Sequence, residues 1–175
     1  ILCRMGALLL ALLIIAGTAQ AQGPAKRVLL EQFTGAWCGW CVDGSVVIEN
    51  LLAQYPNQLI AVKVHQGDGM EIPKVMSDTL RPFVNGYPSG AIDRMLFSGQ
   101  TTVAISRNAW PFYVGQQMAM TADVGVDISN VNFDPTTRKI TADVTATFVK
   151  SVSGDLRINL IIVEDKVTGT GAAYD

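Results

Sequence analysis

Two closely spaced cysteines constrain this chain more than any other feature. Cys38 and Cys41 lie in the run WCGWC, which follows an apolar stretch at 28–33 and leads into a helical pattern. At such a strand-to-helix turn the two thiols can close a small disulfide ring. The first thiol then lies near the helix N-terminus, where free backbone N–H groups and the helix dipole stabilise a thiolate. Because the thiolate is the form that attacks a disulfide, the motif predicts thiol–disulfide exchange, and Pro88 is the proline that would complete such a site.

Two other uses of the cysteine pair remain open. A structural zinc site needs four ligands, and the chain offers this pair and a single histidine, His65. We therefore expect neither a metal nor another cofactor. A static disulfide that staples the end of a helix is the main alternative, because an oxidising compartment favours disulfides of either kind.

The first 21 residues have the layout of a secretory signal peptide. Arg4 precedes an uncharged apolar run at 7–16, and Ala19 and Ala21 supply small residues at the minus-three and minus-one positions, so we expect cleavage after Ala21. A membrane anchor is the alternative, but the run is about half of the ~20 residues that a spanning helix needs. We expect an exported protein of the periplasm, the outer membrane or the cell surface.

Removal of residues 1–21 changes the charge and the cysteine count. It takes away Arg4 and Cys3, and it leaves 12 basic against 15 acidic side chains, a net charge of −3. A mildly acidic chain without a basic run lacks the electrostatic footprint for nucleic acid. The remaining cysteines, Cys38 and Cys41, are expected to form a disulfide. The chain begins without a methionine and stops just after a strand-like run, so we expect a fragment at both ends.

Strand and helix patterns alternate up to about residue 120. Apolar and β-branched residues predict strands at 28–33 and 59–64, and an extended segment at 91–97. Helical spacing predicts a helix at 45–55, stopped by Pro56, and another from Pro73 to Val84. We expect a third helix within 101–120, interrupted near Pro111, because the residue before a proline avoids the helical region.

The pattern then changes to strict alternation. Apolar and polar residues alternate at 124–128, 140–148 and 158–162, with turns at Asp134-Pro135 and Ser153-Gly154. This predicts antiparallel strands with one wet face. Too few strands are present for a membrane barrel, and we expect their apolar faces to be buried in a sandwich.

The order of strand, Trp-Cys-x-x-Cys, helix, strand, helix and proline-bearing turn resembles the thioredoxin superfamily over residues 26–118. Residues 30–41 and 163–169 also resemble the Omp-twenty-eight-related outer membrane proteins, which are exported bacterial proteins with a thioredoxin-like domain and a β-rich C-terminal part. We therefore predict an α/β fold in three parts. They are a signal peptide at 1–21, a thioredoxin-like domain at 22–120, and a β-rich, sandwich-like module at 121–175 that is truncated.

The resemblance to the superfamily implies a role for each residue of the motif. Cys38 would attack a substrate disulfide, and Cys41 would resolve the mixed disulfide. Pro88 would follow a cis peptide bond and lie against the cysteines. The residues implied in substrate binding are Trp37, Trp40, Tyr87 and Pro88. Packing in the core is the alternative for Trp37.

Three positions depart from the superfamily pattern. Gln32 stands where thioredoxins usually carry a buried aspartate that assists proton transfer, and Glu31 should point to the other side of the strand. Val42 replaces the proline that commonly follows the second cysteine, and Trp40 replaces the proline of thioredoxin's Gly-Pro pair. Without the carboxylate we expect slower reductive turnover, while the helix N-terminus still supports the thiolate.

Two further residues are expected to have structural roles. His65 ends a predicted strand and could approach the cysteines, but a loop histidine bound to backbone is the preferred interpretation. Asp43 is a candidate cap for the helix that follows Cys41.

Three functions remain open from the sequence. The first is thiol–disulfide exchange on exported proteins, with a redox partner protein. The second is a non-catalytic envelope protein that keeps its disulfide for stability. The third is a binding module whose β-rich part contacts a protein or a glycan. No serine–histidine–aspartate set or phosphate loop favours a hydrolase or a nucleotide enzyme.

Overall fold

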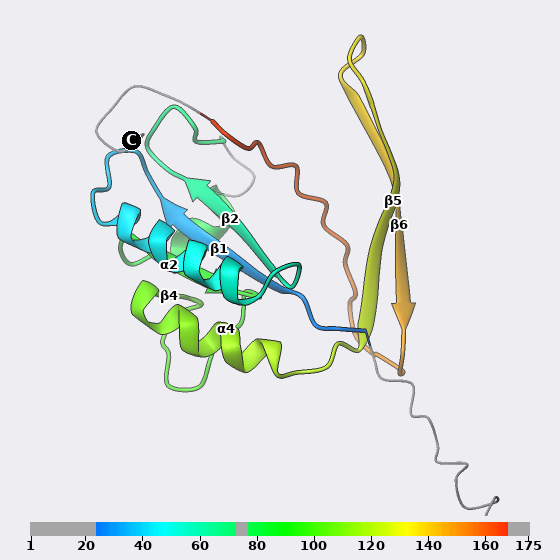
Figure 1. Cartoon of the computed structure of the whole chain (residues 1–175), viewed down its shortest axis with the longest axis horizontal. Helices are drawn as coiled ribbons and strands as arrows, with labels where there is room; N and C mark the ends of the chain where they lie inside the picture. The colour runs from blue at the N-terminus through cyan, green and yellow to red at the C-terminus, as the bar shows by residue number, and fades with distance from the viewer. Residues whose placement is uncertain (1–23, 73–76, 168–175) are drawn as a thin grey trace, which may run out of the picture.

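The computed structural model of the chain describes residues 24–72 and 77–167, so the expected signal peptide lies outside the described residues. Figure 1 shows an α/β part followed by a long two-stranded hairpin. The elements of the α/β part are β1 (Val28–Thr34), α2 (Cys41–Gln54), β2 (Leu59–His65), α3 (Ser77–Leu80), η2 (Arg81–Phe83), β3 (Ser89–Ile92), β4 (Ala104–Ser106), η3 (Arg107–Ala109) and α4 (Trp110–Met118). The hairpin consists of β5 (Val124–Asp134) and β6 (Lys139–Phe148).

The α/β part is built on a four-stranded sheet in the order β2-β1-β3-β4. β1 runs parallel to β2 and antiparallel to β3, and β3 is antiparallel to β4. The parallel pair is joined by α2, as a parallel connection requires. This arrangement, with the cysteine pair between β1 and α2, is a thioredoxin-like fold, as the sequence predicted.

Alternation along β1 divides the buried side chains between the two faces of the sheet. Val28 and Leu30 face α2 and α4, where they pack with Ile48 and Trp110. Phe33 belongs to a second cluster on the opposite face, whose other buried members are Val64, Leu80, Ala91 and Ala104. The central strand is therefore buried on both faces, and its C-terminal end carries the cysteine loop.

Several predicted boundaries differ from the observed ones. The first helix begins at Cys41 rather than at residue 45. The expected extended segment at 91–97 ends at Ile92, because Asp93 and Arg94 adopt positive φ values of 49° and 52° and turn the chain. For the second predicted helix, residues 73–76 lie outside the described residues, and the rest is one short turn of α3 followed by η2.

The third helix lies within 101–120, as predicted, but it is not interrupted near Pro111. Residues 104–106 form strand β4, and α4 begins only at Trp110. Pro111 lies in the first turn of α4, where no intrahelical bond needs its N–H. The proline therefore begins this helix instead of interrupting one.

The hairpin confirms two of the alternating strands, and its turn follows Asp134, whose carboxylate accepts N–H bonds from Thr136 and Thr137. A register shift between Ser129 and Asn132 keeps all apolar side chains on one face. That face consists of Val124, Val126, Ile128, Val131 and Phe133 on β5, and Ile140, Ala142, Val144, Ala146 and Phe148 on β6.

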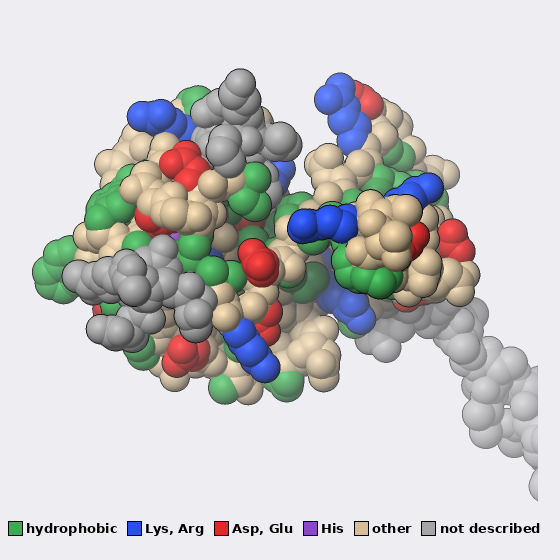
Figure 2. Space-filling model, turned by 90° about the horizontal axis from the view of Figure 1, so that it is seen from above, with side chains coloured by type: hydrophobic (Ala, Val, Ile, Leu, Met, Phe, Trp, Pro, Cys, Tyr) green, Lys and Arg blue, Asp and Glu red, His purple; other side chains and the backbone are tan. Residues whose placement is uncertain are grey.

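Two expectations for this module were wrong within the described residues. The apolar face is not buried in a sandwich: Val126 is 58% exposed and Phe133 is 56% exposed. Figure 2 shows hydrophobic side chains on the surface of the hairpin. The alternating run at 158–162 forms no strand, because its backbone pairs with no neighbouring strand. Of the helices described, none is long and apolar enough to cross a membrane.

Candidate functional site

The cysteine loop joins the end of β1 to the start of α2. The Cys38 N–H donates to the Gly35 carbonyl at 2.9 Å, and the Cys41 N–H donates to the Cys38 carbonyl at 3.0 Å. Trp40 is the N-cap residue of α2. Cys38 and Cys41 form a disulfide with an S–S distance of 2.02 Å and a Cα–Cα distance of 5.4 Å. The pair thus lies at a helix N-terminus, where a thiolate is stabilised.

The two cysteines are buried, whereas the neighbouring tryptophans are exposed to solvent. Cys38 is 5% exposed and Cys41 is 4% exposed, so the disulfide form does not show the greater exposure that a nucleophilic Cys38 would have. Trp37 and Trp40 are 54% and 71% exposed. Core packing is therefore the wrong interpretation of Trp37. Both indoles are accessible, whereas the disulfide in the same loop is shielded.

Trp37 is held in place by its neighbours. Its Nε1–H donates to the Gln66 carbonyl at 2.8 Å, and its ring meets Tyr87 edge to face at 5.0 Å. Two glycines leave room for the ring: a Cβ added at Gly35 would lie 2.5 Å from Nε1, and one at Gly67 would lie 3.1 Å from it. Trp37 is thus both exposed and fixed, which lowers the entropy that a binding partner would have to remove.

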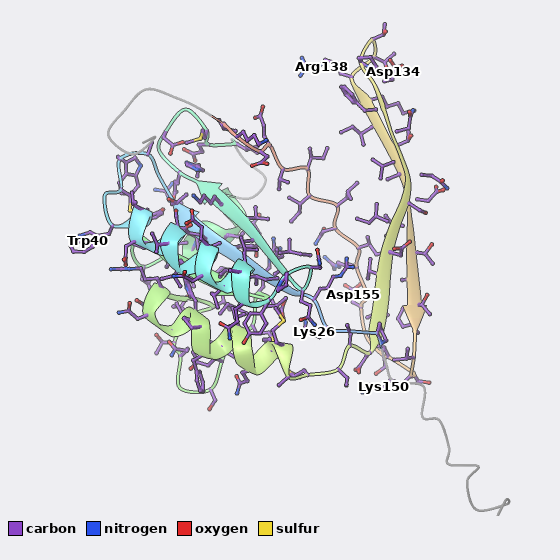
Figure 3. All side chains as sticks on the ribbon, viewed as in Figure 1. Lys26, Trp40, Asp134, Arg138, Lys150 and Asp155 are labelled. Atoms are coloured by element: carbon purple, nitrogen blue, oxygen red, sulfur yellow. A yellow bond between two sulfur atoms is a disulfide. The ribbon has the colours of Figure 1, made fainter. Side chains whose placement is uncertain are left out.

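Trp40 projects from the N-terminal end of α2 (Figure 3) and contacts a cation from another part of the chain. The Arg107 guanidinium lies 5.5 Å from the centre of its ring and pairs with Asp43. The expectation that Asp43 caps α2 was wrong, because this helix has no side-chain cap and the carboxylate faces Arg107 instead. Sequence analysis missed Arg107, since nothing local links it to a residue 64 positions away.

Pro88 follows a cis peptide bond, as the resemblance implied. The Tyr87–Pro88 bond is cis, and Pro88 precedes β3, which pairs with β1. A Cβ added at Gly44 of α2 would lie 3.2 Å from Pro88 Cβ, so the proline packs against the first turns of this helix. The Tyr87 hydroxyl donates to Gln66 Oε1, and burial raises the pKa of this tyrosine. The structure therefore brings Trp37 and Tyr87 together beside the disulfide.

The buried side chain below Cys41 is an amide. Gln32 is fully buried, and its Nε2 donates to the Cys41 carbonyl at 3.1 Å, while its Oε1 has no hydrogen-bond partner. Glu31 points to the opposite side of β1, as predicted, where Arg94 binds its two oxygens at 2.7 Å each. The hydrogen bond with Glu31 raises the pKa of Arg94. Glu31 is thus committed to an ion pair away from the cysteines.

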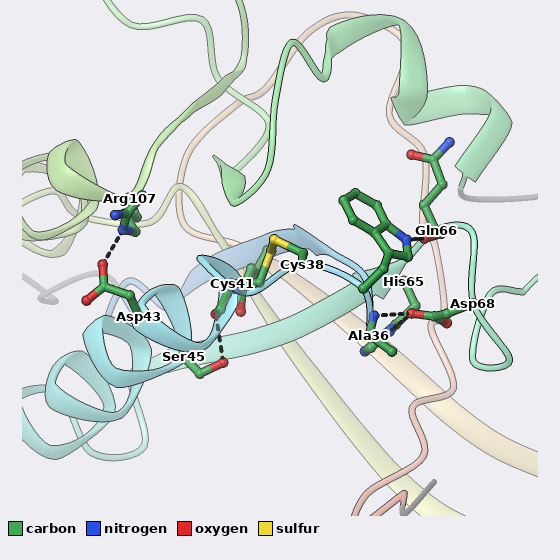
Figure 4. Close-up of a disulfide and its surroundings, with 11 residues drawn as sticks. Ala36, Cys38, Cys41, Asp43, Ser45, His65, Gln66, Asp68 and Arg107 are labelled. Carbon is green, nitrogen blue, oxygen red and sulfur yellow. Dashed lines mark hydrogen bonds and ion pairs between the residues drawn. A yellow bond between two sulfur atoms is a disulfide. The ribbon is translucent and has the colours of Figure 1, made fainter. Parts of the chain in front are cut away.

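His65 binds a carboxylate rather than backbone, which corrects the expectation from the sequence. Its Nδ1 lies 2.7 Å from Asp68 Oδ2, and the same oxygen accepts the Ala36 N–H at 2.7 Å. Figure 4 shows this group on one side of the disulfide and the Asp43–Arg107 pair on the other. Burial raises the pKa of Asp68, but hydrogen bonds from His65, Ala36 and Met70 outweigh it and hold the pKa below its ordinary value.

The polar side chains near the disulfide include one histidine and several carboxylates. Within 24–72 and 77–167, no three histidine, cysteine or acidic side chains are grouped so that they could hold a metal ion.

Similar structures are known for part of the chain. HBP35 of Porphyromonas gingivalis matches with 24% identity and a TM-score of 0.44, over 59% of this chain and 37% of that one. The thioredoxin Deadhead of Drosophila melanogaster matches with 16% identity and a TM-score of 0.37, over 52% and 81%. The J-Trx1 fragment of ERdj5 matches with 20% identity and a TM-score of 0.37, over 57% and 47%. The chain thus spans about a third of the length of HBP35. No family model and no curated protein matches it.

Proposed function

We propose that this chain is a thiol–disulfide exchange protein that acts through Cys38 and Cys41. The observation that carries the proposal is the disulfide at the N-terminus of α2, next to an exposed and fixed Trp37. A disulfide kept only for stability needs no accessible indole held beside it by a hydrogen bond and an aromatic contact. Fixed apolar surface at a reactive sulfur is what a protein substrate would bind.

In the reductive direction the exchange takes two steps. The reduced Cys38 thiolate attacks a substrate disulfide, forms a mixed disulfide and releases one substrate sulfur, which takes up a proton. The Cys41 thiolate then attacks Cys38 Sγ, closes the Cys38–Cys41 disulfide and releases the second substrate sulfur as a thiol. Two electrons pass from the dithiol to the substrate. The reverse sequence oxidises a substrate dithiol.

Four residues form the proposed substrate surface. Trp37 and Trp40 present exposed indoles, Tyr87 meets the Trp37 ring edge to face, and Pro88 packs against α2 near Gly44. This surface fits the segment of an exported protein that carries the substrate disulfide. We propose that Cys38 is the nucleophile of the exchange reaction. Cys41 lies inside α2, and the Cys41 carbonyl accepts a hydrogen bond from Gln32.

A structural disulfide is the second candidate, and the low exposure of both sulfurs favours it. The two candidates differ in what happens when Cys41 is removed. In a Cys41→Ser variant, an exchange protein stops at the mixed disulfide, since the resolving thiol is gone. A structural disulfide leaves no covalent adduct with protein partners.

The test is to express the Cys41→Ser variant in the exporting host and to separate envelope proteins on a non-reducing gel. We expect adducts that dithiothreitol releases and that a Cys38→Ser, Cys41→Ser double variant does not form. Adducts that persist in the double variant, or their complete absence from the single variant, would contradict the exchange function.

We further propose that the protein is exported, by cleavage after Ala21, and works in the periplasm or at the outer membrane. The charge and apolar pattern of 1–21 and the resemblance to the Omp-twenty-eight-related proteins support this. Its partners would be exported proteins and a redox partner protein. Mass spectrometry of the exported protein should show Gln22 as the first residue, and a mature protein that retains residues 1–21 would refute the proposal.

A further inference from the structure

Two loops that lie far apart in the sequence are joined next to the disulfide. The Gln66 N–H donates to the Thr34 carbonyl at 3.0 Å, which extends the pairing of β1 and β2 by one bond. The Ala36 N–H donates to Asp68 Oδ2 at 2.7 Å, and Trp37 Nε1–H donates to the Gln66 carbonyl at 2.8 Å. The segment that precedes Cys38 is therefore held at three successive points by residues 66–68.

Asp68 is the centre of this junction. Its side chain is 6% exposed, and its two oxygens accept bonds from His65, from the Ala36 N–H and from the Met70 N–H at 2.8 Å. Bonds to a buried carboxylate are shorter and stronger than bonds between neutral groups. The same carboxylate thus orders its own loop through Met70 and the cysteine loop through Ala36.

We propose that Asp68 is a positioning residue for the dithiol, which it serves by holding the turn at 35–38 through the Ala36 N–H, with His65 orienting the carboxylate. The inference rests on the proposed function, since it assigns Asp68 a part in the same reaction. Cys38 follows Ala36 by two residues, and its own N–H bond returns to Gly35. A turn held at Ala36 therefore fixes both the backbone of Cys38 and the position of Trp37.

The Asp68 contact should affect the rate of thiol–disulfide exchange. Exchange needs the attacking sulfur in line with the substrate disulfide, and a misplacement of about 1 Å can cost a reaction about 100-fold. A protein substrate that is placed by Trp37 depends on that geometry. A small disulfide reagent, which is not placed by Trp37, depends on it far less. Loss of the Asp68 contact should therefore slow exchange with protein disulfides more than exchange with small ones.

The test compares Asp68→Asn with a matched control, Asp93→Asn. Asp93 also accepts a backbone N–H, that of Leu29 at 2.9 Å, and also pairs with a cation, Lys26 at 2.8 Å, but it lies at the opposite end of β1. In Asp68→Asn an amide that still accepts from Met70 turns its NH₂ group towards the Ala36 N–H, so two donors face each other. The side chain keeps its size, while the bond from the Ala36 N–H and the ion pair with His65, which share Oδ2, are both lost.

We expect Asp68→Asn to reduce a protein disulfide about tenfold more slowly than the unmodified protein, with a much smaller change for a small aromatic disulfide. The Ala36 amide and the Trp37 indole N–H should exchange with solvent faster in NMR spectra. Asp93→Asn should leave all of these rates unchanged. Should Asp68→Asn fail to fold, His65→Ala removes one of the three donors and should change the same rates in the same direction, by less.

Three outcomes would overturn the inference. Unchanged exchange of the Ala36 and Trp37 protons in Asp68→Asn would show that the contact does not hold the loop. Equal slowing with protein and small disulfides, or equal slowing in Asp93→Asn, would show a general loss of stability. If the unmodified protein reduces no disulfide at all, the proposed function fails, together with the catalytic consequence, while the NMR comparison still decides whether Asp68 holds the loop.

Discussion

Single residues set the chemistry of this site, and most of their partners are distant in sequence. The dithiol motif could be predicted from the sequence, because Cys38, Cys41 and Pro88 have a recognisable spacing. Asp68 and Arg107 were not singled out, since each contacts the cysteine loop or α2 only after folding, across 32 and 64 residues. No local sequence pattern shows from which backbone N–H the Asp68 carboxylate will accept a hydrogen bond.

Asp68 also predicts a pH dependence of stability at the residue scale. Its pKa is lowered below 3.8 because hydrogen bonds outweigh the opposing effect of burial. A carboxyl with a lowered pKa in the folded state stabilises the fold at pH values above its unfolded pKa, and this contribution is lost as the pH falls through the folded value. Urea unfolding should therefore show a constant stability difference between the unmodified protein and Asp68→Asn above about pH 5, shrinking below pH 4. A difference that grows on acidification would contradict this assignment.

At the scale of elements, buried glycines decide how closely the helices approach the sheet. Gly90 of β3 lies under the fully buried Trp110 of α4, and a Cβ added there would lie 2.8 Å from the indole ring. The sequence predicted both elements approximately, but not this contact, because helix spacing and strand alternation say nothing about which residues meet. β4 was missed for a related reason: three residues are too few to show alternation.

Gly90→Ala should destabilise the α/β part, because neither the buried indole nor the strand backbone can move away without loss of packing. We expect a decrease of about 1–3 kcal/mol in the free energy of unfolding, which is typical of overpacked cores. Gly86→Ala is the matched control, since a Cβ there would meet no atom within 4 Å. Urea titrations of the two variants check this, and equal midpoints would show that Trp110 adapts freely.

The whole molecule combines a well-packed α/β part with a hairpin whose apolar face is uncovered among the described residues. Alternation alone predicted β5 and β6, because one polar and one apolar face produce a strict period of two. It could not predict whether that face is covered, since burial depends on a second layer rather than on the strand itself. The run at 158–162 has the same alternation but pairs with no strand. Alternation therefore indicates that a segment can form a strand, but it does not show whether a neighbouring strand is present to pair with it.

An uncovered apolar face has a measurable consequence for the whole molecule. The purified chain should bind a hydrophobic dye such as anilinonaphthalene sulfonate, because the hairpin exposes several apolar side chains on one face, among them Val126, Ile128 and Phe133. Replacing Val126 and Ile128 by threonine should reduce the fluorescence, whereas Thr145→Ser with Thr147→Ser, on the polar face of β6, should not. Equal fluorescence from both variants would show that the dye binds elsewhere.

If Cys38 is the attacking thiol of an exchange reaction, it should be alkylated faster than Cys41. A comparison of the two alkylation rates is the most direct test. The protein is reduced, mixed with a limiting dose of an alkylating reagent near neutral pH, and digested for mass spectrometry. Cys38 lies at the N-terminus of α2, while Cys41 is the first residue inside it, so the helix favours the Cys38 thiolate. We predict that Cys38 is labelled well ahead of Cys41. Slow and equal labelling of the two thiols would contradict the account and leave a disulfide that serves only to hold the start of the helix.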